Sequence, residues 1–339
     1  MDRRQWPADH RGMLRRLLIA SSVLILIAIA GLAGAITFDE PAKPPTLAAG
    51  NAVPGIAQWN FAELPPRQHV KARDGAPLNY RHYPGRADRA IVLVHGSTAT
   101  DASMMKLAQA LQTAGASVYA IDLRGHGGSG TANGDVSYLG QLDDDLADLV
   151  KGLGIDKPGV RRTLMGFSSG GGFVLRIASS RYAGLFDNYL AISPFIAPDS
   201  PTNKPNAGGW AGVALPRVVA LSLLDRLGLA WFQGLPAVRF ATDAPPSDRR
   251  TPVYSFRLAM SLQLGRDWRA PLARITAPTE IVVGANDELF NAGAFGPLLQ
   301  AINPRIGVAI APGQGHLAMI ADPAALAAIV TGWQRLSGG

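Results

Sequence analysis

The 339-residue chain contains no cysteine. This absence excludes disulfide bonds, thiol nucleophiles and metal sites with cysteine ligands, although it leaves the cellular compartment open. Charged residues are also sparse, at 17%, and the net charge of +7 comes partly from arginines near the N-terminus. No basic stripe interleaved with aromatic residues is present, which is the pattern expected of a nucleic-acid-binding protein. We expect no nucleic-acid partner, no metal and no cofactor.

Apolar residues are abundant, at 47% of the chain. A chain of this length and composition can bury a large core, and one domain with an insertion accounts for everything beyond the N-terminal segment. No internal repeat is visible. Apolar runs of strand type alternate with helix-like stretches, and this order favours an α/β fold over an all-β fold.

The longest uncharged run covers residues 17–38. As a helix it would extend roughly 33 Å, which is enough to cross the hydrocarbon core of a bilayer. Five arginines precede it, at positions 3, 4, 11, 15 and 16. By the positive-inside rule they hold a basic N-terminus, residues 1–16, in the cytoplasm and place the rest of the chain on the far side. We therefore predict a single-pass membrane anchor.

A secretory signal is the alternative interpretation of this run. The sequence Ala33-Gly34-Ala35 has the small residues that a signal peptidase needs, so cleavage near Ala35 would give a secreted or periplasmic protein. The apolar run is longer than the about 7 to 15 residues of a signal core, which favours a retained anchor. Residues 39–64 are rich in proline and alanine and predict a stiff extracytoplasmic linker.

Residues 166–170 read Gly-Phe-Ser-Ser-Gly, the Gly-x-Ser-x-Gly form of a nucleophile elbow. A buried strand is predicted before them and a helix after them, so Ser168 is expected at a strand-to-helix turn. A turn this tight leaves room only for glycine at Gly166 and Gly170, and it exposes the serine hydroxyl. The pentapeptide alone is weak, because a motif this short also occurs by chance.

A serine hydroxyl needs a base, and in this context the histidine should come later in the chain. Of the six histidines only His316 follows Ser168. It lies in a glycine-rich loop after the apolar run 306–310, as a loop leaving a last strand should. We therefore predict that His316 is the base.

The third group should be a carboxylate that orients the imidazole. Asp287 follows residues 280–284, a predicted strand, so its side chain would emerge at the same sheet edge as the serine and the histidine. Glu288, Asp267 and Asp243 remain alternatives. The order Ser168, Asp287, His316 matches the template of a strand-turn-helix hydrolase.

Two backbone N–H groups are candidates for an oxyanion hole. Residues 90–94 form a predicted buried strand that runs into His95-Gly96-Ser97, where Ser97 can direct its N–H toward a substrate oxygen. Ser169 would supply the second N–H. Residues 120–129 form a strand and a glycine-rich turn that superficially resembles a phosphate-binding loop, but they lack the Gly-Lys-Ser/Thr ending of that loop.

Taken together, these motifs resemble the α/β-hydrolase family, most closely its lysophospholipase and monoacylglycerol-lipase-like members. The features that carry the resemblance are His95-Gly96-Ser97, the Asp-Leu-Arg-Gly-His-Gly of residues 122–127, the 166–170 pentapeptide, Asp287 and His316. The resemblance covers residues 65–336 and implies a mainly parallel eight-stranded sheet flanked by helices. It also implies that the N–H groups of Ser97 and Ser169 form the oxyanion hole. One departure is Phe167, where many lipase-like members have histidine.

The stretch between the predicted strands near residues 192 and 279 is too long for an ordinary connection, and we expect a helical cap at about 197–270. Residues 213–232 are apolar but interrupted by charges and a proline, which argues against a second membrane span and for amphipathic helices. Aromatic side chains are candidates for the lining of a substrate pocket: Phe167, Trp210, Trp231 and Phe232. Aromatic residues of the cap could equally pack it onto the core.

The prediction is a membrane-anchored serine hydrolase that cleaves carboxylic esters through an acyl-enzyme. Its substrate is expected to be lipid-like, of the lysophospholipid or monoacylglycerol type. Two alternatives remain open: an amidase, peptidase or thioesterase with the same triad, and a non-catalytic binding protein on the same fold.

Overall fold

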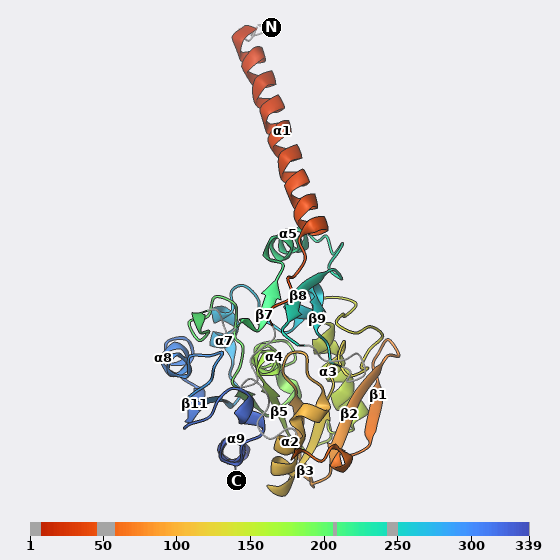
Figure 1. Cartoon of the computed structure of the whole chain (residues 1–339), viewed down its shortest axis with the longest axis vertical. Coiled ribbons are helices and arrows are strands. Elements are labelled where there is room, and N and C mark those ends of the chain that lie inside the picture. Colours follow the sequence, from red (N-terminus) through yellow and green to blue (C-terminus); the bar gives the residue numbers. More distant parts are fainter. Residues whose placement is uncertain (1–7, 46–57, 206–208, 243–249, 339) are drawn as a thin grey trace, which may run out of the picture.

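The computed structural model describes residues 8–45, 58–205, 209–242 and 250–338. A long isolated helix at the N-terminus stands on a small cap, and the cap sits on an α/β body (Figure 1). Part of the linker predicted at 39–64 lies outside the described residues, as does Asp243.

Eight strands form the main sheet, in the order β1-β2-β4-β3-β5-β6-β10-β11. From β4 to β11 neighbouring strands are parallel, whereas β2 is antiparallel to both β1 and β4. The strands of this sheet are β1 (Arg67–Lys71), β2 (Pro77–Tyr83), β3 (Arg86–Val94), β4 (Ala116–Ile121), β5 (Arg161–Phe167), β6 (Asn188–Ile192), β10 (Thr279–Gly284) and β11 (Ile306–Ala311). The prediction of a mainly parallel eight-stranded sheet is confirmed.

Helices cover both faces of the sheet, and the strand sequences explain why. In β3 the side chains of Val92 and Val94 join the core on one face, while those of Ile91 and Leu93 join the core on the other. Because successive strand residues point to opposite faces, only a strand buried on both sides is apolar throughout. The helices of the body are α2 (Met105–Thr113), α3 (Gln141–Gly152), α4 (Ser169–Ala178), α8 (Ala292–Ile302) and α9 (Pro323–Ser337).

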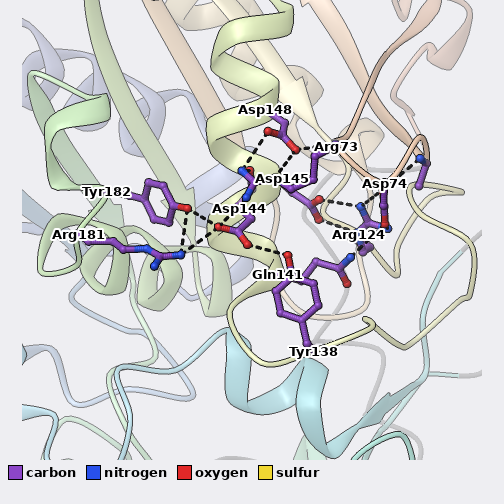
Figure 2. Close-up of polar contacts among 11 residues, drawn as sticks. Arg73, Asp74, Arg124, Tyr138, Gln141, Asp144, Asp145, Asp148, Arg181 and Tyr182 are labelled. Atoms are coloured by element: carbon purple, nitrogen blue, oxygen red, sulfur yellow. Dashed lines mark hydrogen bonds and ion pairs between the residues drawn. The ribbon is translucent and has the colours of Figure 1, made fainter.

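A network of polar and charged side chains joins the β1–β2 turn to α3 and to the turn that follows α4 (Figure 2). Arg124, which is 3% exposed, binds the carboxylates of Asp74 and Asp145 through hydrogen bonds of 2.7 to 3.0 Å. Its guanidinium group lowers the pKa of Asp74. Buried charges persist only when they are paired and hydrogen-bonded. Arg124 therefore holds the turn after β4 in place.

The cap lies between β6 and β10. It contains helices, as predicted, and also a three-stranded antiparallel sheet that the sequence interpretation did not include. Its elements are β7 (Ala211–Val213), α5 (Leu215–Arg226), β8 (Pro236–Phe240), β9 (Val253–Ser255), α6 (Phe256–Ser261) and α7 (Arg269–Arg274). Two of its strands have only three residues, too few to show an alternating pattern in the sequence.

The N-terminal helix α1 (Ala8–Phe38) ends against the cap. Its apolar part, Gly12–Phe38, is long enough to cross a membrane, although a signal sequence would pass the same test. Ile36 packs with Ala220 and Leu221 of α5. The buried Arg217 side chain donates to the carbonyl oxygen of Ile36 at 3.0 Å, and the Arg217 backbone N–H donates to Asp39 at 3.0 Å. The cap therefore binds the last turn of α1 and the chain that follows it.

Candidate active site

Ser168 lies between β5 and α4, at the turn that the pentapeptide predicted. Its backbone has φ 56° and ψ −116°, a conformation that a residue with a side chain rarely adopts. Gly166 and Gly170 make the turn possible. A methyl group on Gly166 would lie 2.4 Å from the Gly170 carbonyl oxygen, and one on Gly170 would lie 2.4 Å from the His95 carbonyl oxygen. Both glycines are therefore required by close backbone contact.

The structure brings Ser168, His316 and Asp287 together from three separate loops. The Nε2 atom of His316 is 3.1 Å from the Ser168 hydroxyl oxygen, and its Nδ1 atom is 2.8 Å from Oδ2 of Asp287. The imidazole and the carboxylate are buried, while Ser168 stays partly exposed. A serine hydroxyl, a base and an orienting carboxylate stand in hydrogen-bonded series, the arrangement that nucleophilic catalysis requires.

The carboxylate of Asp287 is held in its orientation. Its Oδ1 atom accepts hydrogen bonds from the backbone N–H groups of Leu289 and Phe290, both at 2.9 Å, which leaves Oδ2 for the histidine. Burial by itself raises the pKa of Asp287, but the hydrogen bond and charge of His316 and the N–H of Phe290 outweigh it and hold that pKa below its usual range. Asp287 therefore faces His316 as a carboxylate.

The alternative carboxylates are placed elsewhere. Glu288 accepts a hydrogen bond from the backbone N–H of His316 at 2.6 Å, so it supports the loop and does not contact the ring nitrogens. Asp267 is exposed in the cap. In the sequence Glu288 is only an alternative to Asp287 as the orienting carboxylate. No local sequence pattern indicates that its side chain binds the backbone N–H of His316.

The loop of Gly96 and Ser97 packs directly against Ser168. A methyl group on Gly96 would lie 3.0 Å from the Phe167 ring and 3.3 Å from the Cβ atom of Ser168. Ser169 is the first residue of α4, where backbone N–H groups have no acceptor inside the helix. Gly96, the neighbour of Ser97, and Ser169 thus both lie next to the serine.

The comparisons with known proteins show the family of this chain. The family model described as serine aminopeptidase, S33, matches residues 85–322. The chain belongs to the serine aminopeptidase S33 family. It is therefore an enzyme, an ester hydrolase of the α/β-hydrolase fold similar to monoacylglycerol lipases, and the resemblance seen in the sequence is confirmed.

Among the relatives of this S33-family enzyme is a monoacylglycerol lipase of Mycolicibacterium smegmatis, 27% identical over 212 residues, which are 59% of this chain and 70% of the relative. A soluble variant of the Saccharomyces cerevisiae monoglyceride lipase has a similar structure, with a TM-score of 0.63 and 18% identity over 85% of this chain and 98% of that one. A membrane phospholipase A, described as a bacterial virulence factor, has a TM-score of 0.56 and 18% identity, and covers 98% of this chain and 100% of its own. These two structural similarities show the fold.

The predicted pocket residues of this S33-family enzyme divide into two groups. The Phe167 ring is buried with its centroid 4.7 Å from that of His316, so it does lie beside the site. Trp210 packs on Phe240 in the cap. Trp231 and Phe232 are 64% and 58% exposed on the cap. The structure therefore brings only Phe167 of these four residues to the triad.

Proposed function

We propose that this enzyme is a membrane-anchored serine hydrolase that cleaves carboxylic esters of lipid type, with Ser168, His316 and Asp287 as its catalytic triad. The observation that carries the proposal is the continuous hydrogen-bonded series from Ser168 through His316 to Asp287, with distances of 3.1 and 2.8 Å. A binding protein on the same fold would have no need of this alignment.

In the proposed mechanism His316 Nε2 removes the proton of Ser168 while the serine oxygen attacks the ester carbonyl carbon. The negative charge that develops on the carbonyl oxygen is stabilised by the N–H groups of Ser97 and Ser169. Collapse of the tetrahedral intermediate expels the alcohol, which takes the proton from His316, and leaves Ser168 acylated. Water, deprotonated by His316, then attacks the acyl carbon; the bond to the Ser168 oxygen breaks, His316 returns the proton to that oxygen, and the carboxylic acid is released. Asp287 stabilises the imidazolium that forms in each step.

The exposed surface of the cap supports a lipid substrate. Four apolar side chains spaced by four residues line one face of α5 and its end, Leu215, Val219, Leu223 and Leu227, and they are 43–73% exposed. Trp231 and Phe232 add to this surface. Exposed apolar patches of this kind mark sites of contact with membranes or partners.

The position of this surface relative to α1 supports the same conclusion. Leu215 and Val219 face a groove that is also lined by α1 residues Ala28, Gly31 and Leu32. If the span begins at Leu17, these α1 residues belong to its outer half, so α5 would lie at the lipid boundary. We propose that α1 is retained as an anchor, with its N-terminus in the cytoplasm, and that the hydrolase domain works outside the membrane with its cap against the lipid.

Labelling with a fluorophosphonate tests the triad. The full chain in detergent should be phosphonylated on Ser168 and should hydrolyse p-nitrophenyl butyrate, monoacylglycerols or lysophospholipids. Ser168→Ala should lose labelling and all but a residual turnover. Ser169→Ala is the matched control, because its proposed role uses only the backbone N–H. A folded wild-type chain that is neither labelled nor active would refute the proposal.

The membrane proposal can be tested because the chain has no cysteine, so a single introduced cysteine carries a unique label. Environment-sensitive fluorophores at Ile25→Cys and Leu223→Cys, in full-length protein in nanodiscs, should be quenched by nitroxides on lipid acyl chains. A label at Lys157→Cys, an exposed position before β5, should not be quenched. The lipid contact of the cap would be refuted if the label at residue 25 were quenched and the label at residue 223 were quenched no more than the one at residue 157. That result would still support the membrane anchor.

A peptidase is the second candidate, because the matching family model carries the description serine aminopeptidase. The same acyl-enzyme chemistry cleaves an amide if His316 protonates the leaving amine. Turnover of a p-nitroanilide and a p-nitrophenyl ester with the same acyl group separates the two. We expect the ester to have the higher kcat/KM. The peptidase would be favoured if the anilide had the higher kcat/KM and its turnover depended on Ser168.

A further inference from the structure

Both main-chain polar groups of Thr98, next to the proposed oxyanion donor Ser97, are bound by the cap. The N–H of Thr98 donates to the Tyr254 hydroxyl at 2.8 Å, and its carbonyl oxygen accepts from the N–H of Thr251 at 3.1 Å. Thr98 is buried and has φ +64°, in the left-handed region that disfavours residues with a branched side chain. A conformation of this kind persists only where its surroundings hold it, and here the cap does so.

Tyr254 is well placed to hold this loop. Its side chain is 2% exposed, and its hydroxyl is also 2.6 Å from Nε2 of His126. Burial keeps the pKa of His126 well below its usual value, so the ring is neutral. The Nδ1 side of that ring faces the Arg124 carbonyl oxygen, which places the proton on Nδ1 and leaves Nε2 to accept from Tyr254. The hydroxyl thus donates to His126 and accepts from Thr98, and it also binds the side chain of Ser97.

The other side of Ser97 is fixed independently. The carbonyl oxygen of Gly96 accepts hydrogen bonds from His95 Nδ1 at 2.8 Å and from the N–H of Ala99 at 3.3 Å. The peptide joining Gly96 to Ser97 is planar, so the direction of this carbonyl also sets the opposite direction of the Ser97 N–H. The proposed oxyanion donor therefore lies between a peptide held by the body of the enzyme and a peptide held by the cap.

We propose that Tyr254 is a positioning residue for the oxyanion hole, through which the cap keeps the Ser97 N–H aligned on the reacting carbonyl oxygen. The proposal rests on the proposed serine hydrolase function. Tyr254 does not touch the substrate; it acts through the backbone N–H of Thr98 and through the side chain of Ser97. Without its hydroxyl the Thr98 N–H would lose its acceptor, the strained loop would relax, and the Ser97 N–H would lose alignment in the transition state more than in the ground state.

Tyr254→Phe in the full chain is the direct test, because it removes only the hydroxyl and keeps the ring packed on Phe240. We expect kcat for p-nitrophenyl butyrate to fall by about tenfold to a hundredfold and KM to stay within about twofold of the wild type. The fall in kcat should be smaller than the ~10²–10³-fold fall that follows complete loss of one oxyanion-hole donor. Phenylboronic acid, whose boron accepts the Ser168 oxygen and becomes a tetrahedral anion, should lose affinity in proportion to kcat.

Tyr189→Phe is the matched control, since the buried Tyr189 hydroxyl donates to the Ala183 carbonyl oxygen at 2.7 Å, on the β6 strand away from the loop. It should leave kcat within twofold. Thermal unfolding followed by circular dichroism shows whether each variant is folded. If Tyr254→Phe does not fold, Thr251→Val is a milder variant. It keeps the backbone N–H that binds Thr98 and removes only the hydroxyl that anchors residue 251 to the Gly125 carbonyl oxygen at 3.0 Å and to Asn133 at 2.7 Å, so we expect a severalfold lower kcat.

Three results would overturn the proposal: an unchanged kcat in a folded Tyr254→Phe or Thr251→Val variant, a change confined to KM, or an equal loss in Tyr189→Phe. Failure of the underlying function is distinguishable. In that case the wild-type enzyme shows no turnover that depends on Ser168, whereas failure of the Tyr254 proposal leaves this turnover intact in both the wild type and the variant.

Discussion

Replacing Asp287 with asparagine should reverse the tautomer of His316. Oδ1 of Asp287 accepts two backbone N–H groups, so an asparagine in the same orientation must keep its carbonyl oxygen there. Its NH2 group would then face His316 Nδ1, which is 2.8 Å from the present Oδ2 atom. An NH2 group only donates, so Nδ1 would have to become the acceptor and the proton would move to Nε2. His316 could then no longer accept the proton of Ser168.

The expected size of the effect follows from that geometry. Loss of the correct tautomer at such a site lowers kcat by about 10⁴, which corresponds to about 5.5 kcal/mol of transition-state stabilisation. The substitution is isosteric and keeps the two backbone hydrogen bonds, so thermal stability should change little. KM should also change little, because neither Asp287 nor its amide contacts the substrate in the proposed mechanism.

The assay compares kcat for p-nitrophenyl butyrate and the rate of fluorophosphonate labelling in Asp287→Asn and Glu288→Gln. Glu288 accepts a single backbone N–H from His316, which a glutamine carbonyl oxygen can still accept, so this control should lose less than about tenfold. A folded Asp287→Asn variant within tenfold of the wild type would refute the reasoning. A larger loss in Glu288→Gln would assign the orienting role to Glu288 instead.

Three further predictions concern the fold that supports the site. Gly170→Ala should destabilise the enzyme by about 3 kcal/mol and abolish labelling of Ser168, because the new methyl group would meet the His95 carbonyl oxygen at 2.4 Å; a thermal shift and a fluorophosphonate assay check this, and an active, stable variant would contradict it. Burial lowers the pKa of His95 to about 4 and that of His126 well below 6.5. Protonation of either ring below pH 6.5 therefore favours the unfolded state. The free energy of unfolding should fall as the pH drops from 6.5 toward 4, by about 3 kcal/mol for His95. Urea unfolding between pH 7.5 and 4.5 measures the loss, and an NMR titration of either ring near pH 6.5 would be inconsistent with it. Arg217→Met should weaken the attachment of the cap to α1 by about 2 kcal/mol, since the Ile36 carbonyl oxygen loses a charged donor, and hydrogen exchange in α5 should quicken while that in α9 does not.

The site could be predicted from the sequence because its signals are local. The glycines at 166 and 170, the apolar strands before each functional loop and the order of Ser168, Asp287 and His316 are all visible in short windows, and parallel strands bring their carboxyl ends to one edge. The structure agrees on the sheet and brings these three side chains within hydrogen-bond distance.

Other features could not be predicted in this way. The contact of Tyr254 with Thr98 joins residues 156 positions apart and has no local motif. In the sequence Arg217 is one of the charges that interrupt the apolar run 213–232, but its side chain is buried and donates to the carbonyl oxygen of Ile36. Trp231 and Phe232 are candidates for a pocket lining by residue type alone, and large apolar residues more often pack inside, yet both lie on the surface of the cap.

By itself, then, the sequence determined the kind of fold, the order of the catalytic candidates and the presence of a long apolar N-terminal helix, since each depends on residue type and spacing within one element. Only the tertiary structure decided what those elements touch. The packing of the cap determined which side of an apolar segment is buried, which residue binds Thr98, and what the last turn of α1 contacts, because these are properties of surfaces that meet only after the chain has folded.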